Sequence, residues 1–241
     1  MIDLHSHLLP GIDDGATCLD DALHLARIAV ADGITHMVCT PHIHHGRYDN
    51  TKQTIQAALQ ELHEGLHAYK IPLRVAAAAE IRFDMEILVD VQLGSLPYLG
   101  VWQERPILLL EFPHSEVPFG AERLTAWLLR QGIQPMIAHP ERNKGVMRDP
   151  SSLNMFLRQG CLLQVTAGAV AGQFGERARR LAEQLLKQGH VTILASDAHN
   201  RQHRPPVLST GLDAATRLLG AGKAEKLVFD NPWKIARHHF E

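Results

Sequence analysis

Short apolar segments alternate with longer amphipathic segments along this chain, and this alternation limits the fold more than any other feature. The short segments predict strands over 1–4, 35–39, 73–79, 107–110, 134–138, 162–165 and 191–195. The longer segments predict helices near 19–31, 51–69, 119–131, 151–159, 176–188 and 209–219. Because strands that alternate with helices usually pair in parallel, we expect βαβ units.

The length and uniformity of the chain predict one domain. No shift in composition, low-complexity segment or internal repeat divides its 241 residues, and 45% of them are hydrophobic, which is enough for a sizeable core. We therefore expect residues 1–241 to form a single α/β domain. Two architectures fit this pattern, a parallel β/α barrel and an open wound sheet. The length suits the barrel, because such barrels run to roughly 250 residues.

Charge and cysteine usage exclude several classes of partner. The formal net charge is −2 and no long basic run occurs, so neither a nucleic acid nor a membrane surface is indicated. The three cysteines are far apart and odd in number, which argues against a disulfide framework. No signal pattern and no apolar run of the ~20 residues that a membrane span needs is visible, so we expect a cytoplasmic protein with no membrane span. The oligomeric state cannot be predicted.

Ionisable side chains stand where the predicted strands end. Six of the seven strands finish in a histidine, glutamate or aspartate: His5 and His7, His42, Glu80, Glu111, His139, and Asp197 with His199. The sixth strand ends in Thr166 and carries no strong ligand. In a parallel barrel the carboxyl ends of all strands share one face, where active sites lie. We therefore expect these side chains to converge on one pocket.

The composition of this set indicates divalent metal ions. Carboxylates that crowd together in a buried site need cations, because burying them unpaired costs several kcal/mol. The set has no cysteine, which argues against a structural thiolate zinc site, and its mixture of imidazole and carboxylate suits manganese, iron or zinc. Alternate residues of a strand point the same way, so His5 with His7 can grip one ion, as can Asp197 with His199. So many ligands imply two or three ions, which can activate water and hold phosphoryl oxygens.

Several stretches resemble one known superfamily. They are "DLHSHLLPGIDDG", "TPHIHHG", "AAAAEIRF", "LLLEFP", "IAHPERN", "LQVTAGAVAGQFG" and "ASDAHN" followed by "RPP". Together they resemble the polymerase and histidinol phosphatase (PHP) superfamily, and most closely its bacterial protein-tyrosine phosphatases of capsular and exopolysaccharide loci. The likeness runs in order through nearly the whole chain.

The resemblance implies a fold, a cofactor set and a substrate. The fold would be a distorted, seven-stranded (β/α)7 barrel of TIM type that holds three ions, usually manganese. The implied ligands are His5, His7, Glu80 and Asp197 for the first ion, Glu80, Glu111 and His139 for the second, and Asp14, His42 and His199 for the third. Arg142 and Arg204 match arginines that bind phosphate. The substrate would be phosphotyrosine on a bacterial tyrosine autokinase that controls polysaccharide polymerisation and export.

These residues suggest a hydrolytic mechanism. We expect hydroxide bridging the ions to attack phosphorus in line, while the ions, Arg142 and Arg204 neutralise the equatorial oxygens. Phenol is a good leaving group for an alcohol, with a pKa of about 10, so a strong general acid is not required; His199 and a metal-bound water are weak candidates. None of Cys18, Cys39 and Cys161 begins a C-x5-R motif, which excludes a thiolate phosphatase.

Other functions compete with this interpretation. "HEGLH" at 63–67 fits a zinc-protease pattern, but it flanks the apolar stripe of a helix that we expect on the outside of the barrel. The nearest alternative is a phosphatase of a small metabolite such as histidinol phosphate. A metal-dependent nuclease or phosphodiesterase is a further alternative, but this chain lacks the basic stripe that would bind a nucleic acid. A non-catalytic regulator and an amidohydrolase also remain open, because fold does not fix function.

Overall fold

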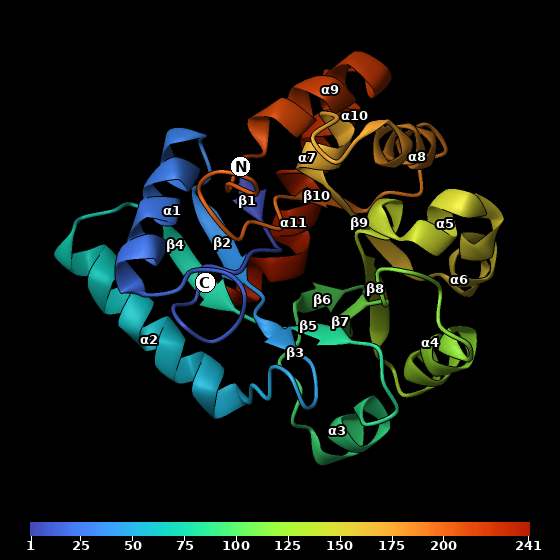
Figure 1. Cartoon of the computed structure of the whole chain (residues 1–241), viewed down its shortest axis with the longest axis horizontal. Coiled ribbons are helices and arrows are strands. Elements are labelled where there is room, and N and C mark those ends of the chain that lie inside the picture. Colours follow the sequence, from blue (N-terminus) through green and yellow to red (C-terminus); the bar gives the residue numbers. More distant parts are fainter.

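A parallel barrel ringed by helices forms the centre of the computed structural model, which describes residues 1–241 (Figure 1). Its strands are β1 (Ile2–Asp3), β2 (His36–Cys39), β3 (His42–Ile43), β4 (Arg74–Ala77), β5 (Glu80–Arg82), β7 (Arg105–Glu111), β8 (Gln134–Ala138), β9 (Leu162–Thr166) and β10 (Ile193–Ala195). One sheet has the order β1-β2-β4 and the other the order β10-β9-β8-β7-β5-β3, and all these pairs are parallel. The parallel pairing expected from the alternation of strands and helices is confirmed.

Backbone hydrogen bonds join the two sheets into a closed barrel. β2 continues into β3, and β4 into β5, after a break of two residues each, and the Ala78 amide donates to the Cys39 carbonyl at 2.8 Å within the break. On the other side, the chain after β1 pairs with the chain after β10. There the His7 amide donates to Ala198 and the Asp197 amide to His5, each at 2.8 Å. The seven expected strand positions therefore close on themselves, and the alternative of an open wound sheet is wrong.

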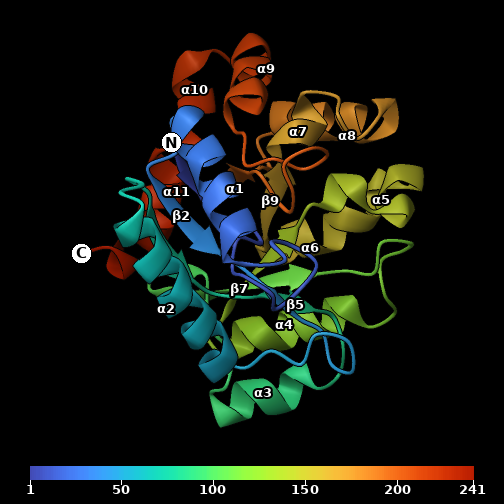
Figure 2. The ribbon, with the colours of Figure 1, turned by 60° about the vertical axis from the view of Figure 1, so that its left-hand side comes forward.

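The long helices lie where the amphipathic segments predict them. They are α1 (Leu19–Ala31), α2 (Lys52–Ala68), α4 (Ala121–Arg130), α8 (Glu176–Lys187) and α9 (Ser209–Leu219), all within two residues of the expected bounds. Figure 2 shows α1 and α2 side by side on the outside of the barrel. The expected helix over 151–159 is wrong in its first part, where Pro150–Leu153 forms a 3-10 turn before α6 (Asn154–Gln159). This turn begins at a capped residue, because the side chain of Asp149 accepts hydrogen bonds from the amide and hydroxyl of Ser151.

Shorter elements were not predicted. They are α3 (Ile87–Leu93), α5 (Lys144–Arg148), α7 (Ala167–Val170), α10 (Ala221–Lys226), α11 (Asp230–Ala236) and β6 (Gly100–Trp102). β6 pairs antiparallel with β7 through a tight turn in which Gln103 and Glu104 both have positive φ, at 49° and 68°. Such turns usually carry asparagine, aspartate or glycine, so the sequence gives no sign of this hairpin.

Two apolar clusters divide the interior. A cluster of 55 buried residues fills the space between the strands and the helices, and a second cluster of 14 lies inside the barrel. α11 and Phe240 close the inner cluster at the amino ends of the strands, where the Ile2 amide donates to the Val228 carbonyl. Gly100 is required here, because a Cβ at this position would lie 2.3 Å from the Ile235 carbonyl oxygen. The carboxyl ends are left for polar side chains.

No helix in the structure has both the length and the apolar character that crossing a membrane requires.

Candidate metal centre

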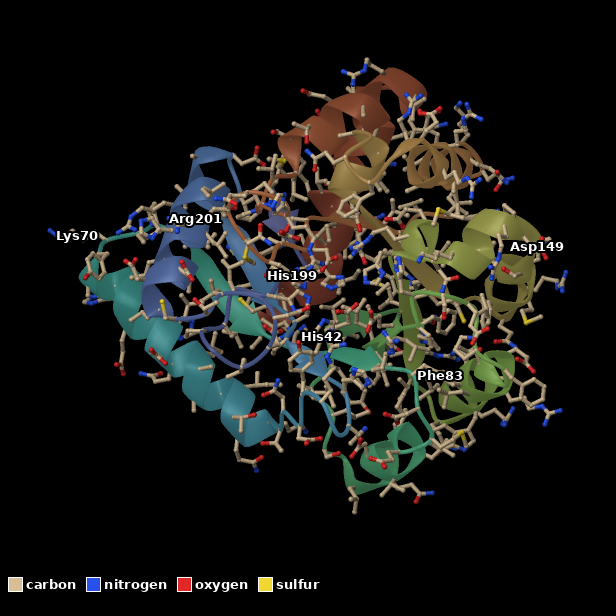
Figure 3. All side chains as sticks on the ribbon, viewed as in Figure 1. His42, Lys70, Phe83, Asp149, His199 and Arg201 are labelled. Carbon is tan, nitrogen blue, oxygen red and sulfur yellow. The ribbon has the colours of Figure 1, made fainter.

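The ionisable side chains at the strand ends meet at the carboxyl end of the barrel. Figure 3 shows His42 and His199 near the middle of the molecule, and their ring centroids lie 6.2 Å apart. Asp197 and His139 leave their strands in the left-handed backbone region, with φ of 52° and 31°. That backbone is unfavourable for residues other than glycine, and residues held in it recur at functional sites.

The deepest group joins β1, β5 and β10. His5, His7, Glu80 and Asp197 are all buried, and each offers one ligand atom within 4.8 Å of the others. The Nε2 atom of His5 lies 3.2 Å from Glu80 Oε2 and 3.3 Å from Asp197 Oδ1. The Nε2 atom of His7 lies 3.4 Å and 3.3 Å from the same two oxygens. These are the four side chains that the resemblance implies for a first ion.

A second group lies toward the opening turn of the chain. It contains His7, Asp14, His42 and His199. The Oδ1 atom of Asp14 lies 3.4 Å from His42 Nε2 and 3.3 Å from His199 Nε2. Asp14 is more exposed than the other three, with 39% of its side chain accessible. The three residues expected around a third ion are therefore together, and His7 joins them.

The third group centres on Glu80. His42 Nδ1 lies 3.1 Å from Glu80 Oε2 and 3.9 Å from Glu111 Oε2, and the three residues form one candidate ligand set. His139, expected beside Glu111, instead approaches the other oxygen of Glu80, with its Nε2 2.8 Å from Oε1. All nine expected ligands thus lie in one continuous cluster, and the division of its ligands among ions stays a prediction.

The donor set fits divalent cations. Glu80 Oε2 and Asp197 Oδ1 are buried and form no hydrogen bond, although imidazole nitrogens lie close to both. Burying a carboxylate oxygen without a partner is costly, so two such atoms facing the same imidazoles fit a site for a cation. Carboxylate and imidazole together suit manganese, iron or zinc.

Electrostatics within the cluster agree with this interpretation. Burial lowers the pKa of His7, but Asp13 and the other carboxylates more than offset this and raise it well above its usual value. Burial likewise raises the pKa of Glu80, but His5 and His42 outweigh it and hold this pKa well below the usual range. These contacts favour the ionised form of Glu80 and the protonated form of His7, and metal ions binding here would displace protons from the imidazoles.

A second layer of side chains orients the ligands. Asp13 Oδ2 lies 2.7 Å from His7 Nδ1 and accepts from the His42 amide, while its Oδ1 accepts from the Gly15 amide. Asp13 therefore both shapes the turn and supports a ligand. Gln164 Oε1 lies 3.0 Å from His5 Nδ1 and accepts from the His139 amide at 3.1 Å. Such contacts fix the ring orientation of a metal-binding histidine.

Arginines surround the cluster. Arg142 and Arg204 both contact Asp197 Oδ2, Arg204 at 3.4 Å, and the guanidinium of Arg142 also lies 4.5 Å from the centre of the Phe174 ring. Both arginines line a cavity of about 250 Å³ together with most of the expected ligands. They are therefore placed to meet an anion in that cavity.

Five more residues line the same cavity, and sequence reasoning gave them no firm role: His44, Arg47, Tyr48, Arg82 and His114. Arg82 Nη1 lies 3.0 Å from Glu111 Oε2. A signal for Arg82 did exist, because it follows Glu80 by two residues on one strand and so points the same way. Arg47 and Tyr48 lie on a turn, where no such periodicity applies.

The protease-like motif lies elsewhere. His63 and His67 belong to α2 on the outside of the barrel and line a hollow of about 770 Å³ at the amino end. The Nε2 atom of His63 lies 3.0 Å from the Val75 carbonyl oxygen. The expectation that this motif is remote from the pocket is confirmed.

The whole chain is similar to proteins of one bacterial family. The profile described as "Capsular polysaccharide synthesis, CpsB/CapC" matches residues 1–237. The chain is 37% identical over 204 residues to the tyrosine-protein phosphatase YwqE of Bacillus subtilis, and the match covers 85% of this chain and 79% of YwqE. It is 28% identical over 244 residues to the tyrosine-protein phosphatase CpsB of Streptococcus pneumoniae, and this match covers 98% of each protein.

Solved structures agree with the sequence matches. A chain from the crystal structures of YwqE and CpsB, metal-dependent tyrosine phosphatases, superposes with a TM-score of 0.91 at 33% identity and covers 99% of this chain and 95% of that one. The organophosphorus hydrolase of Deinococcus radiodurans superposes with a TM-score of 0.58 at 16% identity over 97% of this chain and 91% of its own, which shows the barrel fold alone. The resemblance drawn from the motifs is confirmed, and the chain belongs to the CpsB/CapC family.

Proposed function

We propose that this chain is a metal-dependent protein-tyrosine phosphatase whose substrate is a bacterial tyrosine autokinase that regulates capsule or exopolysaccharide synthesis. The observation that carries the proposal is the cluster of buried carboxylates and imidazoles beside Arg142 and Arg204 in one cavity. The similarity of this chain to YwqE, a tyrosine-protein phosphatase, supports phosphotyrosine as the substrate.

The cofactor in this proposal is three divalent ions, most simply manganese, with iron or zinc as alternatives. The residues that would hold them are His5, His7, Asp14, His42, Glu80, Glu111, His139, Asp197 and His199. Bound there, the ions would supply an activated water as nucleophile and would neutralise charge on the phosphate.

The arginines would bind and orient the phosphate. A guanidinium presents two parallel N–H groups to a phosphate, which gives both strength and orientation. Arg142 has the more rigid position, because it contacts Asp197 and also stacks on Phe174. Arg204 lies on the same loop as His199, and the His199 amide donates to the Arg204 carbonyl at 2.8 Å. Most of the transition-state stabilisation by protein side chains would come from this pair.

His199 fits better as a ligand than as a proton donor. Burial lowers the pKa of His199, and the positive charge of His7 adds to this effect. A neutral imidazole at its Nε2 can bind a metal but cannot give a proton to the leaving oxygen. Since a phenol has a pKa of about 10, the tyrosyl group can depart without a strong acid.

A cytoplasmic location is part of the proposal. The three cysteines are free, and two of them, Cys39 and Cys161, are buried. Free thiols are typical of reducing compartments.

Phosphate release from a phosphotyrosine peptide tests the proposed function. Metal-stripped protein would be assayed with and without manganese, beside a phosphoserine peptide and histidinol phosphate. We expect release that depends on manganese and prefers tyrosine. Preferential release from histidinol phosphate would replace the substrate while keeping the site, and metal binding without any release would contradict the proposal.

A further inference from the structure

Tyr48 stands out among the residues around the metal cluster. It is the one hydrophobic residue of the 14 that line the 250 Å³ cavity, and its side chain is half-buried. The other lining residues are charged or are histidines and offer contacts to the phosphate and the ions. A phosphotyrosine also brings an aromatic ring, which gains most from contact with another ring.

The turn that carries Tyr48 is held firmly against the site. The backbones of His44 and Tyr48 form a reciprocal pair: the His44 amide donates to the Tyr48 carbonyl with an N to O distance of 3.0 Å, and the Tyr48 amide donates to the His44 carbonyl at 2.8 Å. Gly46 provides the positive φ of 76° that the turn requires. Asn50 then donates from Nδ2 to the carbonyls of His42 and Ile12, both at 2.9 Å. The turn is thereby tied both to β3 and to the opening turn that carries Asp14, so Tyr48 keeps a defined place beside the cavity.

Tyr48 also stacks within the site. Its ring lies parallel to the imidazole of His42, with centroids 5.5 Å apart and planes 12° apart. The guanidinium of Arg47 lies 5.1 Å from the centre of the same ring. Arg47 is exposed, so its side chain can swing from the ring to the substrate without breaking a buried contact.

We propose that Tyr48 is a specificity-determining residue that contacts the aromatic ring of the substrate, so that the site favours aryl phosphates over alkyl phosphates. This inference rests on the proposed function and deepens it, because it names the feature that separates phosphotyrosine from phosphoserine. The phosphate of either substrate meets the same ions and arginines. Only the aryl substrate gains the contact with Tyr48 as the phosphate enters the cavity.

Binding of two unreactive phosphonates tests the inference. Manganese-loaded protein would be titrated calorimetrically with phenylphosphonate and with ethylphosphonate. We expect Tyr48→Ala to weaken the binding of phenylphosphonate about tenfold, which is the upper range for one aromatic contact. The affinity for ethylphosphonate should stay within about twofold of the wild type. Tyr48→Phe should bind both ligands as the wild type does, because the ring and not the hydroxyl makes the contact.

A control variant and a metal analysis separate this role from a structural one. Tyr69 lies outside the cavity at the end of α2 and also has an arginine, Arg27, over its ring at 5.6 Å. Tyr69→Ala should therefore change neither affinity. If Tyr48→Ala weakens both phosphonates equally, or lowers the manganese content, Tyr48 acts by holding His42 and the inference is wrong.

Titration does not depend on turnover, so the two proposals can fail separately. A wild-type protein that prefers phenylphosphonate through Tyr48 but releases no phosphate from phosphotyrosine peptide contradicts the proposed function alone. A protein that hydrolyses the peptide and keeps its aryl preference in Tyr48→Ala contradicts the inference alone.

Discussion

The two ends of the barrel are both hollowed and both rich in histidine, yet they differ in chemistry. The amino end has the larger hollow, about 770 Å³, lined by His63, His67 and His239. The carboxyl end has a cavity of about 250 Å³ lined by His42, His139, His199 and others. Neither the size of a hollow nor its number of histidines therefore identifies the functional end.

The partners of the histidines make the difference. At the amino end, the Nε2 atoms of His63 and His239 lie 3.0 Å and 3.2 Å from the carbonyl oxygens of Val75 and Leu99, so each imidazole satisfies one backbone group. At the carboxyl end, His5 and His7 face buried oxygens of Glu80 and Asp197 that form no hydrogen bond, and His42 lies 3.1 Å from the same Glu80 oxygen. Buried carboxylate oxygens that form no hydrogen bond and face several imidazoles indicate a metal site, whereas histidines alone do not.

The replacement Glu80→Gln should have the largest effect at the carboxyl end. It keeps the shape of a side chain that approaches His5, His42 and His139 but removes its charge. We expect kcat/KM toward a phosphotyrosine peptide to fall at least about a thousandfold, because the proposed ions would lose a shared ligand. Steady-state kinetics and measurement of bound metal would check this.

Glu141→Gln is the matched control for that variant. Glu141 is also a fully buried carboxylate near the same end, and its Oε2 likewise forms no hydrogen bond. Its Oε1 accepts from the Thr166 amide at 2.9 Å, and Glu141 belongs to none of the ligand groups. Its activity and metal content should stay close to those of the wild type. An equal loss in both variants would mean that replacing any buried carboxyl group at this end affects activity, and the metal assignment of Glu80 would fail.

Arg142→Lys should have the next largest effect. The positive charge remains, but the planar fork that can hold phosphate and stack on Phe174 is lost. We expect kcat/KM to fall about a hundredfold, with bound metal unchanged. Loss of metal together with activity would show that Arg142 supports the cluster through Asp197 and does not bind phosphate.

Asp13→Ala should have a smaller effect, on metal affinity first. It removes the acceptor that orients the ring of His7 and fixes the backbone at His42 and Gly15. Removing such a supporting group lowers metal affinity about 10- to 100-fold. Titration of metal-stripped protein with manganese would measure this loss. The Asp13→Asn variant keeps an acceptor, so its manganese affinity should lie between those of Asp13→Ala and the wild type.

Much of the carboxyl end could be predicted from sequence because strand periodicity and parallel pairing act together. Once strands end at residues such as His5, Glu80 and Asp197, closing the barrel must bring those residues to one face. The same argument predicts Arg82 as a site residue only if the strand is known to continue past Glu80, as β5 does. The positions of Arg47 and Tyr48 depend on a turn, whose geometry no periodic pattern describes.

Most of the amino end could not be predicted, for a related reason. Its closure depends on short elements, α11 and the β6 hairpin, whose contacts are specific and local. Gly100 is required by the close approach of Ile235, and nothing in the neighbouring sequence shows that approach. Short helices also gain little from intrinsic propensity, so tertiary packing decides whether they form.

His63→Gln should have the smallest effect and is the strictest test of the comparison between the two ends. The variant alters a motif that fits a zinc-protease pattern and a residue that lines the larger hollow. The side chain of His63 forms one hydrogen bond, with a backbone carbonyl, so we expect kcat/KM and bound metal to be unchanged and the free energy of unfolding to fall by about 1 kcal/mol at most. Thermal unfolding would measure the stability, and the phosphotyrosine assay with an analysis of bound metal would measure the other two quantities. A loss of metal or activity comparable with that of Glu80→Gln would mean that the amino end takes part in the chemistry, and buried carboxylates would no longer suffice to tell the two ends apart.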